Sequence, residues 1–365
     1  MRVLHFYPKD DAMVGKYVDT LCESMGLECV NERTTDGDDA QQRLRDRHFD
    51  VLHVHGCWRN ATYGTVRQAF REGTRLVLSP HGQLEPWVQQ DNYWKEKLPK
   101  RLLYQKRIVS QAYVVVIQGK MEGECMEKLG WNRRTAIVRN CLITGSITPK
   151  EMAHQLFMLY RKVMDSNTLA LMNEECREAV TCIVKAGITG DVRWLPKDLP
   201  SFRFDEETWR RVLCYAHQEQ LTDMLMRGCR VLDIDVPDFD ASKAACFLPD
   251  NYAAPESIEH AIGISFATEN ERLMATFRHL RKLVFNHRLT ISHLVELDRE
   301  LRSHGCNEEL LAEDLGESRL LKLAGRTMQL MGDMTGLEEG FMCVPPVDDR
   351  TTRQLRKRIE NHLKL

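Results

Sequence analysis

Short apolar runs alternate with amphipathic stretches over the first 140 residues. Apolar runs of this length predict buried strands, and apolar positions three or four residues apart predict helices. The predicted strands are Val3–Tyr7, Glu28–Asn31, Val51–His55, Leu76–Ser79, Tyr113–Ile117 and Ala136–Val138. The predicted helices are Val14–Met25, Ala40–Arg47, Thr62–Glu72, Asn92–Ser110 and Lys120–Leu129. This alternation is typical of a parallel sheet covered by helices on both faces.

Helical periodicity dominates beyond Thr148, where threonine followed by Pro149 is a typical helix start. The predicted helices there are Pro149–Asp165, Leu169–Ala186, Glu206–Arg227, Asn270–Asn286, Ile291–Ser303 and Arg319–Met331. We therefore predict an α/β protein, with a Rossmann-like parallel-sheet domain over residues 1–147 and a mainly α-helical region over residues 148–365. Glycine and proline make 187–204 and 236–255 candidate boundaries within the helical region.

Composition narrows the class of protein. The chain has 365 residues, 43 % hydrophobic and 28 % charged, which excludes long disordered or collagen-like segments. A net charge of -2 argues against nucleic acid as a partner. Residues 1–150 nevertheless carry a charge of +5 and the remainder -7, so the first part is expected to meet an anionic ligand.

The N-terminal residues and the cysteines favour a reducing compartment. No apolar run approaches the roughly 20 residues of a membrane-spanning helix, and the N-terminus lacks the pattern of a secretory signal. The 12 cysteines include no C-x-x-C pair and are widely scattered, so we expect reduced thiols and a cytoplasmic protein.

Candidate chemistry lies where the predicted strands end, because ligands of parallel sheets bind at the carboxyl edge. Gly15-Lys16 opens the first helix, His55-Gly56-Cys57-Trp58 follows the third strand, and His81-Gly82 follows the fourth. Glycine lets backbone approach a ligand, indole stacks on a sugar or base, and histidine exchanges hydrogen bonds near neutral pH.

Each of these residues also has a purely structural interpretation. His53, inside the third strand, is expected to be a core histidine, whereas His55 and His81 fit a site or a structural role equally well. Trp58 and Trp87 are either stacking surfaces or hydrophobic lids. The chain has neither G-x-G-x-x-G nor a Walker loop, which argues against a dinucleotide dehydrogenase and a P-loop nucleotidase.

Residues 87–107 are basic and partly aromatic, a composition that suits a phosphate-bearing substrate or an anionic membrane surface. The competing interpretation is the solvated face of a helix. The acidic stretch from Asp233 to Asp240 lacks the glycine and distal glutamate of a calcium loop, and no His/Cys spacing matches a zinc site. We therefore predict no metal-binding residues and no resident cofactor, and the sequence leaves the metal requirement of a reaction open.

Three strings together resemble glycosyltransferase family 4: residues 49–56 (FDVLHVHG), residues 78–87 (LSPHGQLEPW) and Arg139-Asn140. The resemblance covers about residues 1–145. It implies two Rossmann-like domains around a cleft and transfer of a sugar from a nucleotide donor with retention at the anomeric carbon. The N-terminal domain would chiefly receive the acceptor.

The resemblance also implies roles for individual residues. His81 would lie near the reacting sugar as the catalytic residue. Gly15 would let the first loop approach the donor phosphates, and Trp87 with the basic helix would hold the acceptor. The full set of implied substrate-binding residues is Gly15, His55, Gly56, Trp58, Gly82, Glu85, Trp87, Arg139 and Asn140.

The second half departs from the family pattern. Strand–helix alternation stops after residue 145, and Glu339-Gly340-Phe341 is followed by Met342 where the family has glycine. Arg133, Arg134 and Arg139 are therefore the candidate contacts for the donor diphosphate.

We expect a glycosyltransferase-like protein of polysaccharide or glycolipid assembly, which binds a nucleotide sugar and a glycan or glycolipid acceptor. A homo-oligomer, a partner subunit and peripheral membrane contact through residues 87–107 remain open. The alternative is a non-catalytic accessory protein that binds a glycan, nucleotide or protein.

Overall fold

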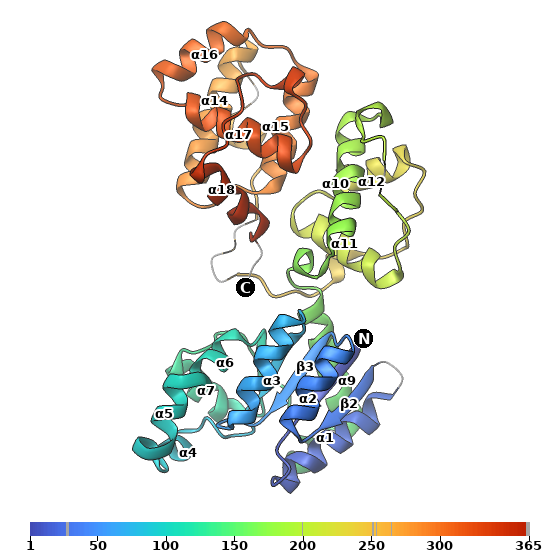
Figure 1. Ribbon diagram of the computed structural model, residues 1–365, viewed down its shortest axis with the longest axis vertical. Helices are drawn as coiled ribbons and strands as arrows, with labels where there is room; N and C mark the ends of the chain where they lie inside the picture. The colour runs from blue at the N-terminus through green and yellow to red at the C-terminus, as the bar shows by residue number, and fades with distance from the viewer. Residues whose placement is uncertain (27–28, 199, 250–251, 253, 264, 363–365) are drawn as a thin grey trace. The chain divides into compact units, whose positions relative to one another are not determined.

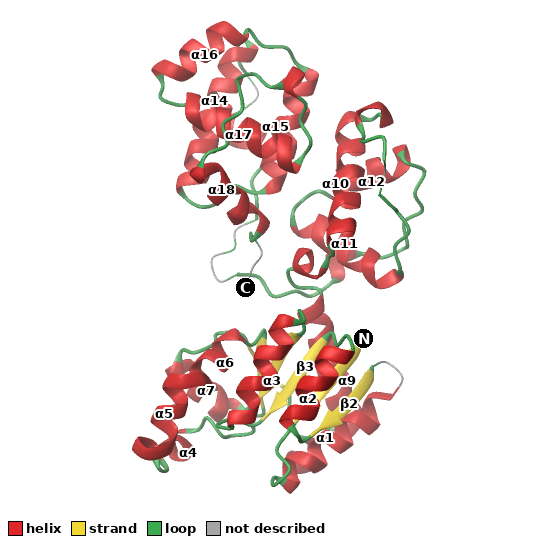
Figure 2. Ribbon diagram, viewed as in Figure 1, coloured by secondary structure: helices red, strands yellow, loops and turns green. Residues whose placement is uncertain are grey.

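The structure is a computed structural model that describes residues 1–26, 29–198, 200–249, 252, 254–263 and 265–362 (Figures 1 and 2). The chain forms two compact units. Unit 1 comprises Met1–Ser166 with Ala245–Phe247, and unit 2 comprises Asn167–Ala244 with Leu248–Leu365. Within the described residues, no helix has both the length and the apolar character needed to cross a bilayer.

Unit 1 is built on a six-stranded, fully parallel sheet in the order β2-β1-β3-β4-β5-β6 (Figure 2). The strands are β1 (Arg2–Phe6), β2 (Val30–Thr34), β3 (Val51–His55), β4 (Arg75–Ser79), β5 (Val114–Ile117) and β6 (Thr135–Ile137). This confirms the predicted α/β fold. The second predicted strand began at Glu28, which lies outside the described residues, and the observed strand starts at Val30.

The helices of unit 1 are α1 (Ala12–Met25), α2 (Gly37–Asp46), α3 (Asn60–Arg71), α4 (Pro86–Gln90), α5 (Leu98–Lys100), α6 (Lys106–Gln111), α7 (Lys120–Leu129), α8 (Cys141–Thr144) and α9 (Pro149–Met164). Because crossovers between parallel strands are right-handed, the reversal of direction after β2 places α1 on one face and the following helices on the other. The pairs α2 with α3 and α1 with α9 pack together accordingly (Figure 1).

Alternation along the strands gives the two faces of the sheet different chemistry. Leu4, Leu52 and Leu78 point toward the apolar core that α2 and α3 complete. The opposite face, under α1 and α9, carries His5 and His53, both fully buried. A buried polar layer therefore lies between the sheet and the pair α1–α9.

Helix α9 lies in unit 1, although we predicted the boundary at residues 147/148. Buried Arg75 of β4 donates to the carbonyl oxygens of Val163 and Ser166, where α9 ends, and its guanidinium lies 4.5 Å from the Tyr113 ring centroid. Carbonyl groups at a helix end have no partner within the helix. The arginine supplies that partner, so the compact unit extends to Ser166.

Helices are the only regular secondary structure among the described residues of unit 2, which confirms the predicted mainly helical region. Its helices are α10 (Glu174–Thr189), α11 (Glu206–Gln218), α12 (Thr222–Val231), α13 (Ile258–Ile262), α14 (Glu269–Phe285), α15 (Ile291–Ser303), α16 (Glu308–Glu317), α17 (Leu321–Met334) and α18 (Arg350–Glu360). The single helix predicted over Glu206–Arg227 is wrong, because Gln220, with φ 58°, separates α11 from α12. Positions 199, 250–251 and 253 of the two candidate boundaries lie outside the described residues.

Glycines bring α10 and α12 into direct backbone contact. A Cβ atom on Gly187 would lie 2.0 Å from the Met224 carbonyl oxygen, and one on Gly228 would lie 1.8 Å from the Ile183 carbonyl oxygen. No side chain fits at either position, so this helix pair depends on both glycines.

Candidate functional site

The candidate site lies at the topological switch point of the sheet. Strand β1 has β2 on one side and β3 on the other, and the chain leaves β1 and β3 in opposite directions. Connections that diverge in this way open a crevice at the carboxyl ends of the two strands, where open α/β sheets bind their ligands. Three loops meet this edge: those after β1, β3 and β4.

The loops after β3 and β4 hold unusual backbone conformations. Gly56 and Trp58 have φ values of 87° and 66°, and His81 and Gly82 have φ values of 51° and 77°. The φ of Gly56 favours glycine, and a Cβ there would lie 3.3 Å from the side-chain amide of Gln83, closer than most such contacts. Positive φ at a tryptophan and a histidine costs conformational energy and is concentrated at functional sites in proteins.

Trp58 is part of the scaffold of these loops. Its indole N–H donates to the Gln83 carbonyl (2.8 Å), its backbone N–H donates to Gln105 Oε1 (2.7 Å), and its side chain is 5 % exposed. The backbone N–H of Cys57 donates to Gln83 Oε1 (2.6 Å) in the same cluster. Burial leaves the indole no open face for a sugar, which favours the structural interpretation of Trp58 over the stacking role.

A chain of hydrogen-bonded side chains crosses the switch point from Asn31 on β2 to Gln118 after β5. His5 joins Asn31 through Nε2 (3.1 Å) and His55 Nε2 through Nδ1 (3.1 Å). His55 Nδ1 is 3.1 Å from His81 Nε2, and His81 Nδ1 is 2.7 Å from the Gln118 amide nitrogen. We call these five residues the histidine chain.

The partners at one end assign the protons along the whole histidine chain. The Asn31 amide nitrogen donates to the Cys29 carbonyl, so Asn31 Oδ1 is the acceptor facing His5. His5 then carries its proton on Nε2 and accepts at Nδ1. The same reasoning places the protons of His55 and His81 on Nε2 and makes the Gln118 amide the donor to His81 Nδ1. With all three imidazoles neutral, each hydrogen bond of the histidine chain has one donor and one acceptor.

Burial keeps these imidazoles neutral. It lowers the pKa of His5 and of His81 to about 4, and it lowers the pKa of His53 and His55 well below the usual value. At pH 7 His81 is therefore a neutral group that offers hydrogen bonds and no positive charge. A leaving diphosphate must find its counter-charge elsewhere in the site.

His53 is the core histidine that we predicted, since it is fully buried. Its ring nitrogens lie 2.6 Å from the Tyr160 hydroxyl and 2.7 Å from Ser79 Oγ. His5, His53 and His55 each bring a ring nitrogen within 4.8 Å of the others, a spacing that a metal ion could span. All six of their ring nitrogens already have side-chain partners, so the residues fit a hydrogen-bonded cluster better than a ligand set.

Glu122 at the start of α7 joins the loop after β4 to the end of β5. Its carboxylate accepts the backbone N–H groups of Gly82 and Gln118, both at 2.8 Å, and the side chain is 4 % exposed. Burial raises the pKa of this carboxyl although the two N–H groups oppose the shift. Burial and the neighbouring Glu122 charge raise the pKa of Glu85 as well.

The remaining predicted site residues lie in different environments. Trp87 on α4 is 56 % exposed, and Arg139, after β6, is exposed. Asn140 is buried and caps α8, accepting from the Leu142 N–H at 2.9 Å. In the described part of the chain, no hydrogen bond or ring contact joins these three residues to the histidine chain. The structure thus brings together His55, His81 and their adjoining glycines, with Glu85 close to Gly82.

Sequence reasoning missed His5, Asn31, Gln118 and Glu122. Alternation within the third strand does place His53 and His55 on one face. The register that sets His5 opposite His53 is a property of the assembled sheet. Glu122 and Gln118 follow a strand end, which was the only signal that could have found them.

Replacing Gly15 with alanine separates the structural role of this glycine from its binding role. A Cβ there would lie 3.7 Å from Tyr7, an ordinary contact, inside helix α1. Alanine should therefore raise the free energy of unfolding by about 0.5–1 kcal/mol. If backbone must approach donor phosphates here, the same methyl group should weaken nucleotide-sugar binding by about tenfold, roughly 1.4 kcal/mol.

Urea unfolding and calorimetric titration of Gly15→Ala measure the two effects. Gly316→Ala in α16 is the control, since its Cβ would have no neighbour within 4 Å and it should change stability alone. Unchanged donor affinity in Gly15→Ala would remove this glycine from the site.

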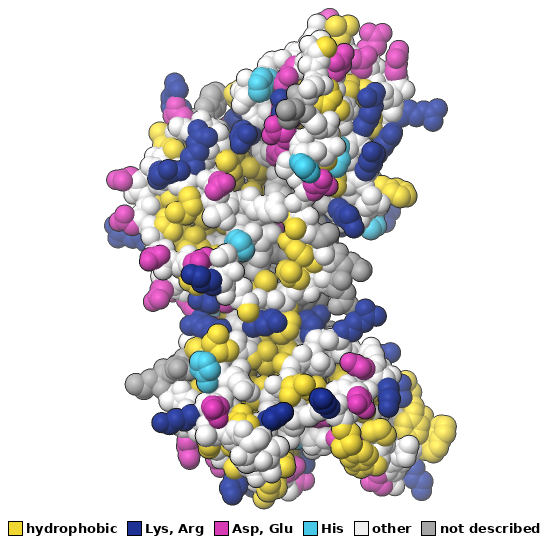
Figure 3. All heavy atoms as spheres, turned by 180° about the vertical axis from the view of Figure 1, so that it is seen from behind, with side chains coloured by type: hydrophobic (Ala, Val, Ile, Leu, Met, Phe, Trp, Pro, Cys, Tyr) yellow, Lys and Arg dark blue, Asp and Glu magenta, His cyan; other side chains and the backbone are white. Residues whose placement is uncertain are grey.

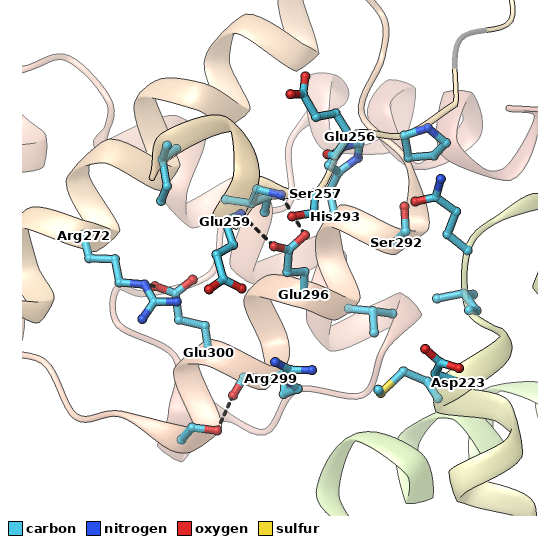
Figure 4. A pocket seen from close by; sticks show the side chains of 18 of the residues that line it. Asp223, Glu256, Ser257, Glu259, Arg272, Ser292, His293, Glu296, Arg299 and Glu300 are labelled. Atoms are coloured by element: carbon cyan, nitrogen blue, oxygen red, sulfur yellow. Dashed lines mark hydrogen bonds and ion pairs between the residues drawn. The ribbon is translucent and has the colours of Figure 1, made fainter. Parts of the chain in front are cut away.

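A separate cavity of about 360 Å³ lies within unit 2, lined mainly by residues of α12, α13 and α15, with Arg272 of α14 (Figure 4). Glu296 accepts the backbone N–H groups of Ile258 and Glu259, each at 2.8 Å, and Arg272 pairs with Glu300 at 3.0 Å. The lining carboxylates outnumber the arginines. The charged lining residues are Asp223, Glu256, Glu259, Glu296, Glu300, Arg272 and Arg299. An acidic lining of this kind does not suit a diphosphate.

Comparison with known proteins finds one family model that matches part of unit 1. The family model described as a glycosyl transferase 4-like domain matches residues 32–141, which run from β2 to the start of α8. No curated protein and no solved structure matches the chain significantly. The matched residues include both strand-end loops, with His55 and His81. The N-terminal unit of this chain therefore contains a glycosyltransferase 4-like region, as its sequence motifs predicted.

Proposed function

We propose that unit 1 takes part in transfer of a sugar from a nucleotide sugar to a glycan or glycolipid acceptor. The bond between the anomeric carbon and the diphosphate oxygen breaks, and a bond from that carbon to an acceptor hydroxyl forms. The hydroxyl proton leaves with the nucleoside diphosphate. The observation that carries the proposal is the match of residues 32–141, which covers the loops after β3 and β4 at the switch point.

His81 acts in this proposal as a hydrogen-bonding group at the reacting sugar. Its Nε2–H donates to His55 Nδ1, so Nδ1 of His81 is the ring atom left for a ligand. Nδ1 accepts from Gln118 in the structure, and a sugar hydroxyl would take the place of that amide. With its pKa lowered to about 4 by burial, the ring accepts a hydrogen bond without becoming charged.

In this proposal, cationic groups at the same edge of the sheet neutralise the negative charge of the leaving diphosphate. Arg139 follows β6 and Lys16 lies in the first turns of α1, and both side chains are exposed. No ion pair joins either of them to another described residue. A guanidinium that is free in this way can form the paired hydrogen bonds that phosphates favour.

The test uses the full-length chain with a panel of UDP-, GDP-, ADP- and dTDP-sugars. Calorimetry measures binding, and release of nucleoside diphosphate measures turnover. One nucleotide class should bind below millimolar concentration, and Arg139→Met should weaken it by about 10- to 100-fold, the value of a charged hydrogen bond. Lys322→Met, at an exposed site in unit 2, is the matched control. Absence of binding to every donor at millimolar concentration would contradict the proposal.

A non-catalytic binding role is the second candidate. Both ring nitrogens of His81 already have side-chain partners, and the described residues of unit 2 contain no second parallel sheet. In the same assay this role predicts saturable binding of a nucleotide, sugar or glycan with no release of diphosphate in the presence of any acceptor.

A further inference from the structure

A long helical segment after α4 exposes large apolar side chains to solvent. Trp94, Leu102 and Leu103 are 78 %, 76 % and 74 % exposed, and Trp87 on α4 is 56 % exposed. Among the described residues, only one other large apolar side chain, Phe285 in unit 2, exceeds 70 %. A space-filling view shows apolar side chains gathered near basic ones at the α4–α5 end of unit 1 (Figure 3). We call Trp87, Trp94, Leu102 and Leu103 the apolar patch.

The backbone of this segment keeps the apolar patch on its outer side. Two π-helical turns, Tyr93–Lys97 and Arg101–Gln105, interrupt the α-helical geometry between Tyr93 and Gln111. A π-turn holds more residues than an α-turn and so retards the rotation of successive side chains. Tyr104, Ile108 and Val109 are thereby buried while Leu102 and Leu103 stay exposed. π-turns of this kind recur at functional sites.

Exposed basic side chains lie in the same segment as the apolar patch. Lys95 and Lys106 are exposed, and Glu96 is already paired with Lys100 at 2.7 Å. Residues 86–111 hold six Lys and Arg against two Asp and Glu. Exposed tryptophan and leucine together with an excess of cations is the composition of surfaces that enter the interface of an anionic bilayer.

A groove of about 410 Å³ between α3 and α6 continues this surface. Three of its lining residues are arginines, Arg67, Arg71 and Arg107, and none is acidic. No ion pair or side-chain hydrogen bond joins these guanidinium groups to any other described residue. Arg107 lies four residues after Leu103, so the groove and the apolar patch are neighbours on one helix. Three unpaired guanidinium groups around one hollow match a phosphate group.

We propose that the apolar patch and the arginine groove dock unit 1 on an anionic phospholipid bilayer. Trp94, Leu102 and Leu103 enter the headgroup and upper acyl region, and the groove holds the phosphate of a lipid headgroup. A protein partner would need matching acidic and apolar groups on its own surface, whereas an anionic leaflet supplies both everywhere. The inference stands apart from the proposed function, since docking requires neither donor nor acceptor.

The experiment is co-sedimentation of the full chain with vesicles of phosphatidylcholine alone or with 30 % phosphatidylglycerol. We expect binding to the anionic vesicles only. Trp94→Ser/Leu102→Ser/Leu103→Ser should weaken it at least 100-fold, because each buried apolar side chain is worth about tenfold or more. Phe285→Ser/Leu310→Ser, which removes exposed apolar groups from unit 2, should leave binding unchanged.

A second set of variants tests the arginine groove. Arg67→Gln/Arg71→Gln/Arg107→Gln should weaken binding by about 100-fold, since each basic residue near an anionic leaflet contributes about fivefold. Arg281→Gln/Arg288→Gln/Lys322→Gln in unit 2 removes the same charge from exposed positions and should have little effect. Failure to bind anionic vesicles, or equal losses in both charge variants, would overturn the proposal. Self-association of the chain that the Trp94/Leu102/Leu103 variant abolishes would instead assign the apolar patch to a second copy.

Discussion

Lowering the pH from 7 to 5 is expected to destabilise unit 1 strongly. Burial lowers the pKa of His5 and of His81 to about 4, and it also lowers the pKa of His53 and His55 well below the usual value. An unfolded histidine titrates near pH 6.5, so the unfolded chain binds more protons than the folded one below that pH. The stability that these neutral histidines contribute is therefore fully present above about pH 6.5, and it is lost as the pH falls toward 4.

The size of the effect follows from the same shifts. A histidine whose pKa falls from 6.5 to about 4 on folding contributes about 2 kcal/mol less to the free energy of unfolding at pH 5 than at pH 7. His5 and His81 together amount to about 4 kcal/mol, and the lowered pKa values of His53 and His55 add to the loss, so the total is a large share of the stability of many domains. Glu85 and Glu122, whose pKa values are raised chiefly by burial, oppose the loss only near the acid end.

Hydrogen-exchange mass spectrometry between pH 7 and pH 5, corrected for the intrinsic exchange rate, measures this transition in each unit. Peptides from β1, β3 and β4 should lose protection together. His5→Gln should move the midpoint to lower pH because one titrating group is gone. His154→Gln, at an exposed position on α9, should leave it in place. Constant protection of these strands down to pH 5 would contradict the assignment of neutral, buried imidazoles.

Replacing His81 with alanine is expected to reduce both stability and transfer. The variant loses the donor to His55 Nδ1, a buried acceptor. Leaving such an acceptor unsatisfied costs about 1–3 kcal/mol. Loss of the hydrogen bond to the sugar should lower kcat/KM by about 10- to 100-fold, provided that His81 Nδ1 contacts the reacting sugar.

A second variant separates these two effects. The side-chain amide of His81→Gln can replace the Nε2 proton that His55 accepts, so this variant should recover stability in urea unfolding without recovering transfer. Normal transfer in a destabilised His81→Ala protein would show that His81 is structural only.

The sheet could be predicted because each strand is an apolar run between helical patterns. Val51–His55 and Lys120–Leu129 were predicted with their observed bounds. Helix α18 was missed because only Leu355 and Ile359 interrupt its polar sequence as buried apolar residues. Its structure depends on packing against α17, which periodicity alone does not reveal.

The candidate site was only partly predictable for a related reason. Strand ends pointed to His55, His81 and their glycines, since position along a strand can be read locally. The histidine chain depends on strand register and on Tyr17 and Tyr160 of α1 and α9, whose rings lie against His81 and His53. Such contacts join residues up to 107 positions apart, as between His53 and Tyr160, and follow from tertiary packing.

The central claim is that a nucleotide sugar binds at the carboxyl edge of the sheet in unit 1. Hydrogen exchange of the full chain with and without a saturating nucleotide sugar tests it directly. The account predicts new protection in the loops at residues 8–16, 55–60, 81–87 and 118–122, with no change around the cavity of α12, α13 and α15. Protection confined to that cavity, or to no part of unit 1, would contradict it.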